Sequence, residues 1–359
     1  MQSEPHGREG SRQQEPTNDA ASAGAVYVQT NTAPNEVIAF RRANDGSLDL
    51  IGSVATGGDG DRSPHLQSQG SVTLTGDGQH LLVTNAASDD LSVFSVGADG
   101  SIELRGRVHT GSTPRSVDER DGLVVVLNTG DPGLASFRLD AEGIDRVEGG
   151  DQALDPSHAD PAQVAFSPDG TMILITERAS DSIVTYELTA DGTLGDSSVI
   201  ASEGPTPYGF AFTSGGTLIV TEAFGAEKGA AAASSYAIED GSLVARSSSV
   251  GNGRSEICWA VITPDDRFAF TTNFADGAVS RYAIAADGSL SLEDATAGIS
   301  VDGTPGLRDE DITGDGRFLY AIDADGGRIY GWSVDAEGSL EPVGSWDELP
   351  GTVAGLAAR

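Results

Sequence analysis

Short apolar runs separated by polar turns recur along nearly the whole chain. The clearest unit lies between Pro161 and Pro207, where four runs rich in Val, Ile, Thr, Phe and Tyr are bounded by Gly, Pro or Asp. These residue types favour strands. Asp-Gly between two such runs indicates a hairpin, because glycine adopts a positive φ without steric cost. Each unit is therefore predicted to be a meander of four antiparallel strands, named A, B, C and D in chain order.

The turn between strands C and D recurs seven times. Its glycines follow Asp or Glu and lie 43 to 54 residues apart, at Gly46, Gly100, Gly143, Gly192, Gly241, Gly288 and Gly338. A period of about 50 residues with four strands per unit predicts a β-propeller. The A–B turn occurs only six times, because the first unit opens directly on a B-type strand at Ala25.

The C-terminal segment is predicted to supply the missing strand. Residues 352–357 have the character of an A strand, yet no unit follows them. We therefore predict an all-β fold: a seven-bladed β-propeller of four-stranded antiparallel blades, in which this C-terminal strand completes blade 1 by pairing with residues 25–30. Such closure removes free sheet edges. The propeller is expected to span residues 25–359 as one domain, after a disordered polar arm over residues 1–24.

Charge narrows the range of partners. The net charge is −34, the sequence pI is about 4.1, and Lys228 is the one lysine among 21 basic residues. Phosphate groups would be repelled, so we expect neither a nucleic-acid nor a membrane partner. The acidic surface favours a halophilic, cytoplasmic protein, and we expect a monomer. Cys258 is the single cysteine, which excludes an intrachain disulfide.

One face of the predicted propeller should carry the functional site. The A–B and C–D turns are short and regular, whereas the D–A and B–C connections on the opposite face are longer and irregular. The B strands end on that face in a ring of polar residues: Asn31, Asn85, Asn128, Glu177, Glu222, Asn273 and Asp323. Asn and Asp suit the capping of a turn. Glutamate is one methylene too long for that role, so Glu177 and Glu222 are candidate catalytic groups. His158, in a loop beside Asp155 and Asp160, is a third.

A second ring lies where the A strands begin. It supplies the candidate binding residues Arg115, Gln163, Tyr208, Arg254, Trp259 and Arg308. Arg115 and Arg308 could hold a carboxylate or a developing oxyanion, or instead pair with neighbouring acids such as Glu310. Trp259 could form the floor of a pocket or pack within its blade.

Other catalytic signatures are absent from the sequence. It contains no nucleophile elbow, HExxH, CxxC or phosphate loop, so no cofactor is predicted. The inner strands carry Asp118, Glu119, Glu310 and Asp311, which leaves a divalent cation in the central channel as an open alternative.

Several segments resemble the lactonase family of seven-bladed propellers, which includes a bacterial class of 6-phosphogluconolactonases and fungal carboxymuconate cyclases. The segments that carry the resemblance are residues 68–72, 75–78, 85–94, 113–117, 160–170, 221–225, 271–273 and 354–357. Members of the phosphogluconolactonase type carry Pro-Arg-His at the start of an A strand and Asn-Glu at the end of the next strand. Here the corresponding residues are Pro207-Tyr208-Gly209 and Thr221-Glu222. Only the glutamate matches, which argues against a phosphorylated sugar lactone.

The resemblance implies hydrolysis of a small organic lactone in the central funnel, with Glu177 or Glu222 as general base and Arg115 or Arg308 stabilising the oxyanion. Its partner would then be a small-molecule lactone or organic acid. Two alternatives remain at this stage. One is a muconate-type lactonising cyclase, and the other is a non-catalytic scaffold that binds a small ligand, an ion or a protein.

Overall fold

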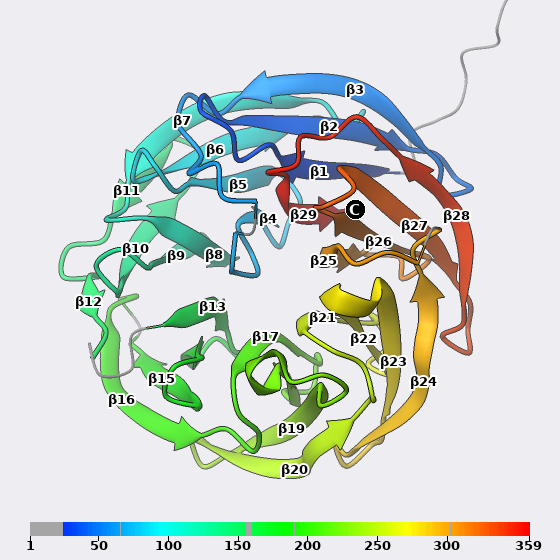
Figure 1. Ribbon diagram of the computed structural model, residues 1–359. Coiled ribbons are helices and arrows are strands. Elements are labelled where there is room, and N and C mark those ends of the chain that lie inside the picture. Colours follow the sequence, from blue (N-terminus) through cyan, green and yellow to red (C-terminus); the bar gives the residue numbers. More distant parts are fainter. Residues whose placement is uncertain (1–23, 65, 156–159, 190, 302) are drawn as a thin grey trace, which may run out of the picture.

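The chain forms a ring of seven antiparallel sheets in a computed structural model, which describes residues 24–359 except 65, 156–159, 190 and 302 (Figure 1). The predicted seven-bladed β-propeller is confirmed. Residues 1–23 of the predicted arm lie outside the described residues, and the first strand begins at Gly24, one residue earlier than expected. Among the described residues, no helix has the length and apolar character needed to span a membrane.

Blades 1 to 3 occupy the first half of the chain, apart from one C-terminal strand. Blade 1 contains β1 (Gly24–Gln29), β2 (Glu36–Arg42), β3 (Leu48–Ala55) and β29 (Ala354–Ala358). Blade 2 contains β4 (Val72–Leu74), β5 (His80–Asn85), β6 (Asp90–Val96) and β7 (Ile102–His109). Blade 3 contains β8 (Pro114–Arg120), β9 (Leu123–Asn128), β10 (Gly133–Leu139), β11 (Ile144–Arg146) and β12 (Gln152–Ala153). Its D position is divided, since β11 and β12 both pair with β10.

Blades 4 to 7 follow the predicted order A, B, C, D. Blade 4 contains β13 (Pro161–Phe166), β14 (Met172–Glu177), β15 (Ser182–Leu188) and β16 (Leu194–Ala201). Blade 5 contains β17 (Pro207–Phe212), β18 (Leu218–Glu222), β19 (Ala232–Glu239) and β20 (Ser242–Gly251). Blade 6 contains β21 (Ile257–Ile262), β22 (Phe268–Asn273), β23 (Ala278–Ile284) and β24 (Leu290–Ile299). Blade 7 contains β25 (Leu307–Ile312), β26 (Phe318–Asp323), β27 (Arg328–Val334) and β28 (Leu340–Trp346).

Two short 3₁₀ helices, Phe224–Ala226 (η2) and Phe274–Asp276 (η3), occupy B–C connections in blades 5 and 6. The hydrophobic core lies between the faces of neighbouring blades. Val28 and Phe40 of blade 1, for example, cluster with Tyr320 and Ile329 of blade 7. Strands buried on both faces in this way read as near-continuous apolar runs.

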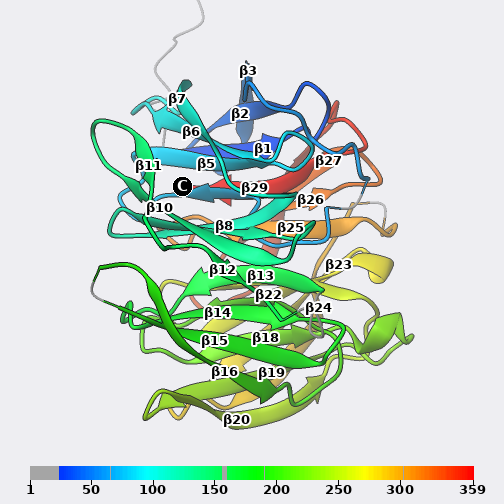
Figure 2. The same ribbon diagram turned by 90° about the vertical axis from the view of Figure 1, so that its left-hand side faces the viewer.

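The C-terminal strand closes the ring, as predicted. β29 lies beside β1 in both views (Figures 1 and 2), with Val28 opposite Leu356 and Val26 opposite Ala358. The strand begins at Ala354 rather than at Thr352. The reason is local, because the Thr352 hydroxyl donates to the Thr30 carbonyl at 2.7 Å and a turn precedes the strand.

Carboxylates from blade 7 fasten β29 in place. The N–H groups of Gly355 and Ala358 donate to Asp309 and Asp311 at 3.1 and 2.8 Å. The buried Arg42 side chain adds a third link, since its Nε donates to the Arg359 carbonyl at 3.0 Å. Burial raises the pKa of Asp309 and of Asp311 to about 7. The bonds to Asp309 and Asp311 therefore cross the seam between the last and first blades, while the Arg42 bond holds the C-terminal residue within blade 1.

Removing residues 351–359 should open the ring. The deletion exposes one edge of β1 to the channel and leaves the acids of blade 7 without their donors. We expect aggregation or a large fall in the thermal midpoint, measured by scanning calorimetry and light scattering, and partial recovery on adding a peptide of residues 351–359. A truncated protein that stays monomeric and melts like the full chain would contradict the closure.

Glu310 should make stability depend on pH. Its side chain is 4% exposed, its Oε1 accepts a bond from the Thr272 N–H at 3.1 Å, and its Oε2 has no partner. Burial raises the pKa of Glu310 well above the ordinary value of 4.5. The unfolded chain thus loses this proton at lower pH than the folded protein, and the wild type loses stability as the pH rises through that window.

Glu310→Gln removes this effect, because the amide imitates the protonated acid. Relative to wild type, we expect little change at pH 5 and a gain at pH 8, growing by up to about 1.4 kcal/mol per pH unit. Urea unfolding at fixed ionic strength measures the free energy of unfolding of the variant and of the wild type at each pH. Repulsion among the other acids contributes equally to both proteins and cancels in the difference. An equal difference at both pH values would count against this account of the buried acid.

Candidate functional site

The start of each inner strand is distorted in five blades. The register with the neighbouring strand shifts at Arg115, Ala162, Tyr208, Cys258 and Arg308, or between them and the next residue. A β-bulge of this kind bends the strand and re-aims its side chains. Of the predicted inner-ring residues, Arg115, Tyr208, Trp259 and Arg308 lie at the bulges. Gln163 follows the bulge at Ala162, and Arg254 lies before the start of β21.

Three of these bulges surround one cavity. It has a volume of about 400 Å³ and lies among blades 4 to 7. Tyr208, Cys258 and Arg308 contribute from blades 5, 6 and 7, while Asp160 and Arg178 contribute from blade 4. The remaining lining residues are Gln67, Thr206, Ala223, Gly225, Ala226, Glu256, Ile257 and Phe274.

Arg308 is a buried charge of this cavity that has no ionic partner among the described residues. Its side chain is only 9% exposed, yet among the described residues it makes no ion pair and no hydrogen bond, and its Nε has no partner. The guanidinium carbon lies 4.2 Å from the centroid of the Phe274 ring, a cation–π contact. A buried charge without a partner is costly. Arg308 is therefore a ready binding site for an anion.

Arg178 lies across the cavity in a more satisfied state. It forms an ion pair with Asp160 at 2.5 Å, donates to Gln67 at 3.3 Å, and lies 5.0 Å from the centroid of Tyr208. Tyr208 in turn stacks on Trp259 with ring centroids 4.7 Å apart. Trp259 is fully buried and packs against Tyr208, and it does not itself line the cavity.

Burial keeps two weak acids of the cavity protonated at neutral pH. It raises the pKa of the Tyr208 hydroxyl above its ordinary range and that of the Cys258 thiol to about 12. Tyr208 can therefore donate a hydrogen bond, and Cys258 is a poor nucleophile because it is not a thiolate. The carboxylate of Glu256 also lines the cavity and, within the described ranges, makes no hydrogen bond or ion pair. It is the carboxylate there that is free to act on a ligand.

The two glutamates predicted as catalytic groups do not line this cavity. Glu177 is fully buried, and its Oε2 accepts the backbone N–H of Asp160 at 3.0 Å. Burial, with a smaller contribution from Asp160, raises the pKa of Glu177 to about 7. Glu222 is equally buried and accepts bonds from Ser234, Ser249 and the Gly204 N–H at 2.5, 2.7 and 2.8 Å. Both side chains fasten D–A loops, which is a positioning role.

The structure distributes the other predicted residues among different tasks. Arg115 pairs with Asp61 at 3.2 Å rather than with Glu310. Gln163 clamps blade 5, because its amide exchanges two hydrogen bonds with the backbone of Phe210, at 2.9 and 2.7 Å. Arg254 does not line the cavity. His158 lies outside the described residues.

Sequence reasoning missed Arg178, Phe274 and Gln67 as cavity residues. Arg178 directly follows Glu177 at the end of the B strand of blade 4, and Phe274 directly follows Asn273 in blade 6, so both occupy the same position of the repeat. A search one residue beyond the ring of B-strand ends would have found them. Gln67 offered no such signal, because it arrives from blade 2.

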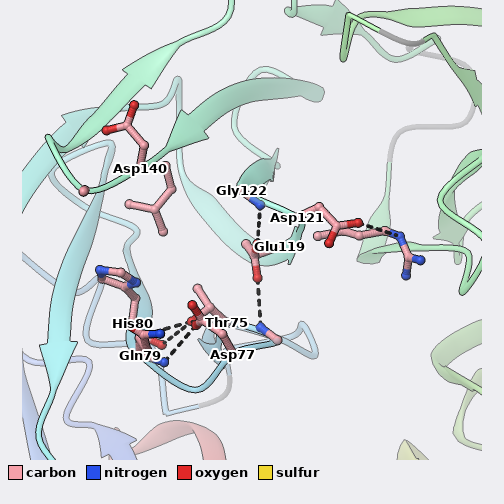
Figure 3. Close-up of a pocket in the computed structure, with 12 residues that line it drawn as sticks. Thr75, Asp77, Gln79, His80, Glu119, Asp121, Gly122 and Asp140 are labelled. Carbon is pink, nitrogen blue, oxygen red and sulfur yellow. Dashed lines mark hydrogen bonds and ion pairs between the residues drawn. The ribbon is translucent and has the colours of Figure 1, made fainter.

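A larger hollow of about 820 Å³ lies at the turns of blades 2 and 3, lined by Asp77, His80, Glu119, Asp121 and Asp140 among others (Figure 3). Acidic side chains of this hollow already accept hydrogen bonds from backbone N–H groups of the turns. Glu119, for instance, accepts the N–H groups of Gly76 and Gly122 at 2.9 and 2.6 Å. Within the part of the chain that the structure describes, no group of three or more His, Cys, Asp or Glu could hold a metal ion.

Glu222→Gln should destabilise the protein more than Glu177→Gln. Glutamine keeps one acceptor oxygen, so at least one donor around residue 222 loses its partner, at about 1–3 kcal/mol. Glu177 accepts with one oxygen only and its Oε1 has no partner, so an amide fits there. Chemical unfolding of the two variants at pH 8 tests the contrast, and a larger loss for Glu177→Gln would refute these assignments.

Solved structures share this fold at low sequence identity. A candidate 6-phosphogluconolactonase from Bacteroides fragilis is 18% identical and aligns with a TM-score of 0.72, covering 96% of this chain and 100% of its own. A second such protein, from Bacteroides uniformis, is 18% identical with a TM-score of 0.70, covering 92% and 98%. The periplasmic gluconolactonase of Pseudomonas aeruginosa is 17% identical with a TM-score of 0.69, covering 93% and 98%.

Sequence comparison identifies the family. No curated protein sequence matches this chain. The sequence profile described as "Lactonase, 7-bladed beta-propeller" matches residues 21–144, 144–224 and 220–353, which together span nearly the whole propeller. The chain therefore belongs to the lactonase family of seven-bladed β-propellers.

Proposed function

We propose that this protein hydrolyses a small organic lactone in the cavity among blades 4 to 7. One observation carries the proposal: Arg308 is a buried guanidinium without an anionic partner, at the wall of a cavity of about 400 Å³. That volume suits a small molecule. Membership of the lactonase family supports the reaction class.

The cavity holds the groups that lactone hydrolysis requires. The Glu256 carboxylate takes a proton from water while the water oxygen attacks the lactone carbonyl. Negative charge then develops on the carbonyl oxygen, where the Arg308 guanidinium stabilises it. The ring C–O bond breaks, the leaving alkoxide takes the proton back from Glu256, and an open hydroxy acid results. No covalent enzyme intermediate is needed.

Asp160 and Arg178 form the opposite wall. Their ion pair would hold the ring substituents, and the Tyr208 hydroxyl could donate to them. Glu177 would act indirectly, because its carboxylate accepts the Asp160 N–H and so positions the backbone of Asp160. In this proposal the glutamate general base expected from the resemblance is Glu256, in a D–A connection, and Glu177 is a positioning residue.

An assay with a panel of aldonolactones and muconolactones at pH 7 tests the proposal. Lactones hydrolyse spontaneously, so turnover is measured above a blank without enzyme. We expect Glu256→Gln to lower kcat/KM by about 10²-fold or more, and Arg308→Met by about 10²–10³-fold. Glu227→Gln, which alters an exposed glutamate outside the cavity lining, and Arg115→Met, which alters the ring arginine paired with Asp61, should retain activity.

The controls separate chemistry from folding. All four variants should keep a cooperative thermal transition. A wild type without turnover above the blank on any lactone would overturn the proposal and favour a binding scaffold. Equal losses in Glu256→Gln and Glu227→Gln would overturn the assignment of the base.

A further inference from the structure

Residues 66–71, the last part of the connection from β3 to β4, contribute Gln67 to the lining of the cavity. This segment contacts blades 3, 4 and 6. The Ser68 hydroxyl donates to the Ala162 carbonyl of blade 4 at 2.5 Å. Ser116 of blade 3 donates to the Gln69 carbonyl at 2.6 Å. The segment is thus tied into the ring from several directions.

Gln69 spans the channel from blade 2 to blade 6. Its Nε2 donates to the Ala260 carbonyl at 2.9 Å, and its Oε1 accepts the Ala260 N–H at 3.3 Å. On the way it passes blade 5 so closely that a Cβ on Gly209 would lie 2.5 Å from Oε1. The same Cβ would lie 2.8 Å from the Cys258 carbonyl oxygen and 2.9 Å from the Trp259 Cα, so the backbone of blade 6 and Gln69 together leave no room for a side chain at position 209.

A second hollow lies further along the same inner strands. It has a volume of about 290 Å³ and is lined by Gln69 and Gly70 together with the middle of six inner strands. We call it the inner chamber. Its wall includes the apolar side chains of Val117, Val164, Val261 and Leu356, and the acids Asp118, Glu310 and Asp311.

Gln69 lines the inner chamber but not the outer cavity, and its partner Ala260 lies between the residues of β21 that line the two hollows. On β21 the outer cavity is lined by Cys258 and the inner chamber by Val261, three residues or about 10 Å further along the strand. On β25 the corresponding residues are Arg308 and then Glu310. Gln69 binds Ala260, between those levels, while Gln67 of the same segment lines the outer cavity.

We propose that Gln69 is a specificity-determining partition, which ends the outer cavity and excludes longer ligands from the inner chamber. This inference rests on the proposed function for its biological meaning, although the partition itself is a matter of binding. The ligand it would exclude has an anionic head for Arg308 and an apolar tail. The tail must be uncharged, because three carboxyl groups face the chamber and no basic residue lines it.

Straight-chain monocarboxylates from propionate to octanoate, titrated calorimetrically at fixed ionic strength, test the partition. In the wild type, affinity should stop rising once the chain fills the outer cavity. In Gln69→Ala the two hollows join, and affinity should keep rising by about fourfold for each further methylene buried. Gln69→Asn, one methylene shorter, should extend the series by less.

Two matched variants separate volume from lost hydrogen bonds. Gln163→Ala removes the same pair of bonds to a backbone, that of Phe210. It enlarges the inner chamber, which Gln163 also lines, but leaves Gln69 in place. It should lower the thermal midpoint much as Gln69→Ala does, while keeping the wild-type dependence on chain length. Gln69→Met keeps the volume and loses the bonds, so it should also keep the wild-type dependence.

The chain-length dependence decides the matter. The same plateau in Gln69→Ala as in wild type, or an equal extension in Gln163→Ala, would overturn the partition. So would the failure of every carboxylate to bind. Extension in Gln69→Ala without lactone turnover in the wild type would leave the partition standing and remove the proposed function. Lactone turnover in the wild type, without a longer affinity series in Gln69→Ala, would support the proposed function and overturn the partition.

Discussion

Each blade turns one sheet edge toward the central channel, and the backbone groups along that edge have no further strand to pair with. Polar side chains on the inner strands, and Gln69 just before β4, form hydrogen bonds with some of these backbone groups. Asp118 accepts the Phe166 N–H of the next blade at 2.8 Å, and Asp311 accepts that of Ala358 at the closing seam. Gln163 and Gln69 each serve both a donor and an acceptor. These side chains form a hydrogen-bond network that links separate sheets. Its acids are buried because they accept hydrogen bonds from backbone N–H groups at the inner sheet edges.

The same inner strands also create the cavity. Near its start each of five inner strands carries a β-bulge, and the bulged residues Tyr208, Cys258 and Arg308 of three of them line the cavity. Where such a residue is Arg115, an acid pairs with it. No described acid forms an ion pair with Arg308, although the chain carries 55 acidic residues and only 21 basic ones. An unpaired guanidinium in so acidic a protein attracts anions that the rest of the surface repels. This contrast is why the cavity around Arg308, rather than the larger hollow at the turns, is the candidate site.

The fold could be predicted from the sequence because each blade is marked by local features, namely short apolar runs and the turns between them. Seven Asp-Gly or Glu-Gly turns set the repeat, and the missing A–B turn predicted closure by the C-terminal strand. The positions of the inner ring were also predictable, and of its candidate binding residues Tyr208 and Arg308 line the cavity, whereas Trp259 packs against Tyr208. Local signals do not reveal partners far away in the chain. Glu177 and Glu222 were predicted to be catalytic from the length of their side chains and from the family resemblance. The structure shows them accepting the N–H groups of Asp160 and Gly204 in D–A loops, and Glu222 also accepts the hydroxyls of Ser234 and Ser249. Gln69 reaches Ala260 across 191 residues, a contact that no periodic pattern encodes.

The central claim is that the cavity beneath Arg308 binds an organic anion. A crystal structure of the protein soaked with 4-bromobenzoate tests it most directly, because the anomalous signal of bromine locates the ligand without reference to turnover. We expect a bromine peak inside the cavity lined by Tyr208, Cys258 and Phe274, with the carboxylate on the Arg308 guanidinium. Peaks confined to exposed arginines at the rim, with the cavity holding only water, would contradict the account.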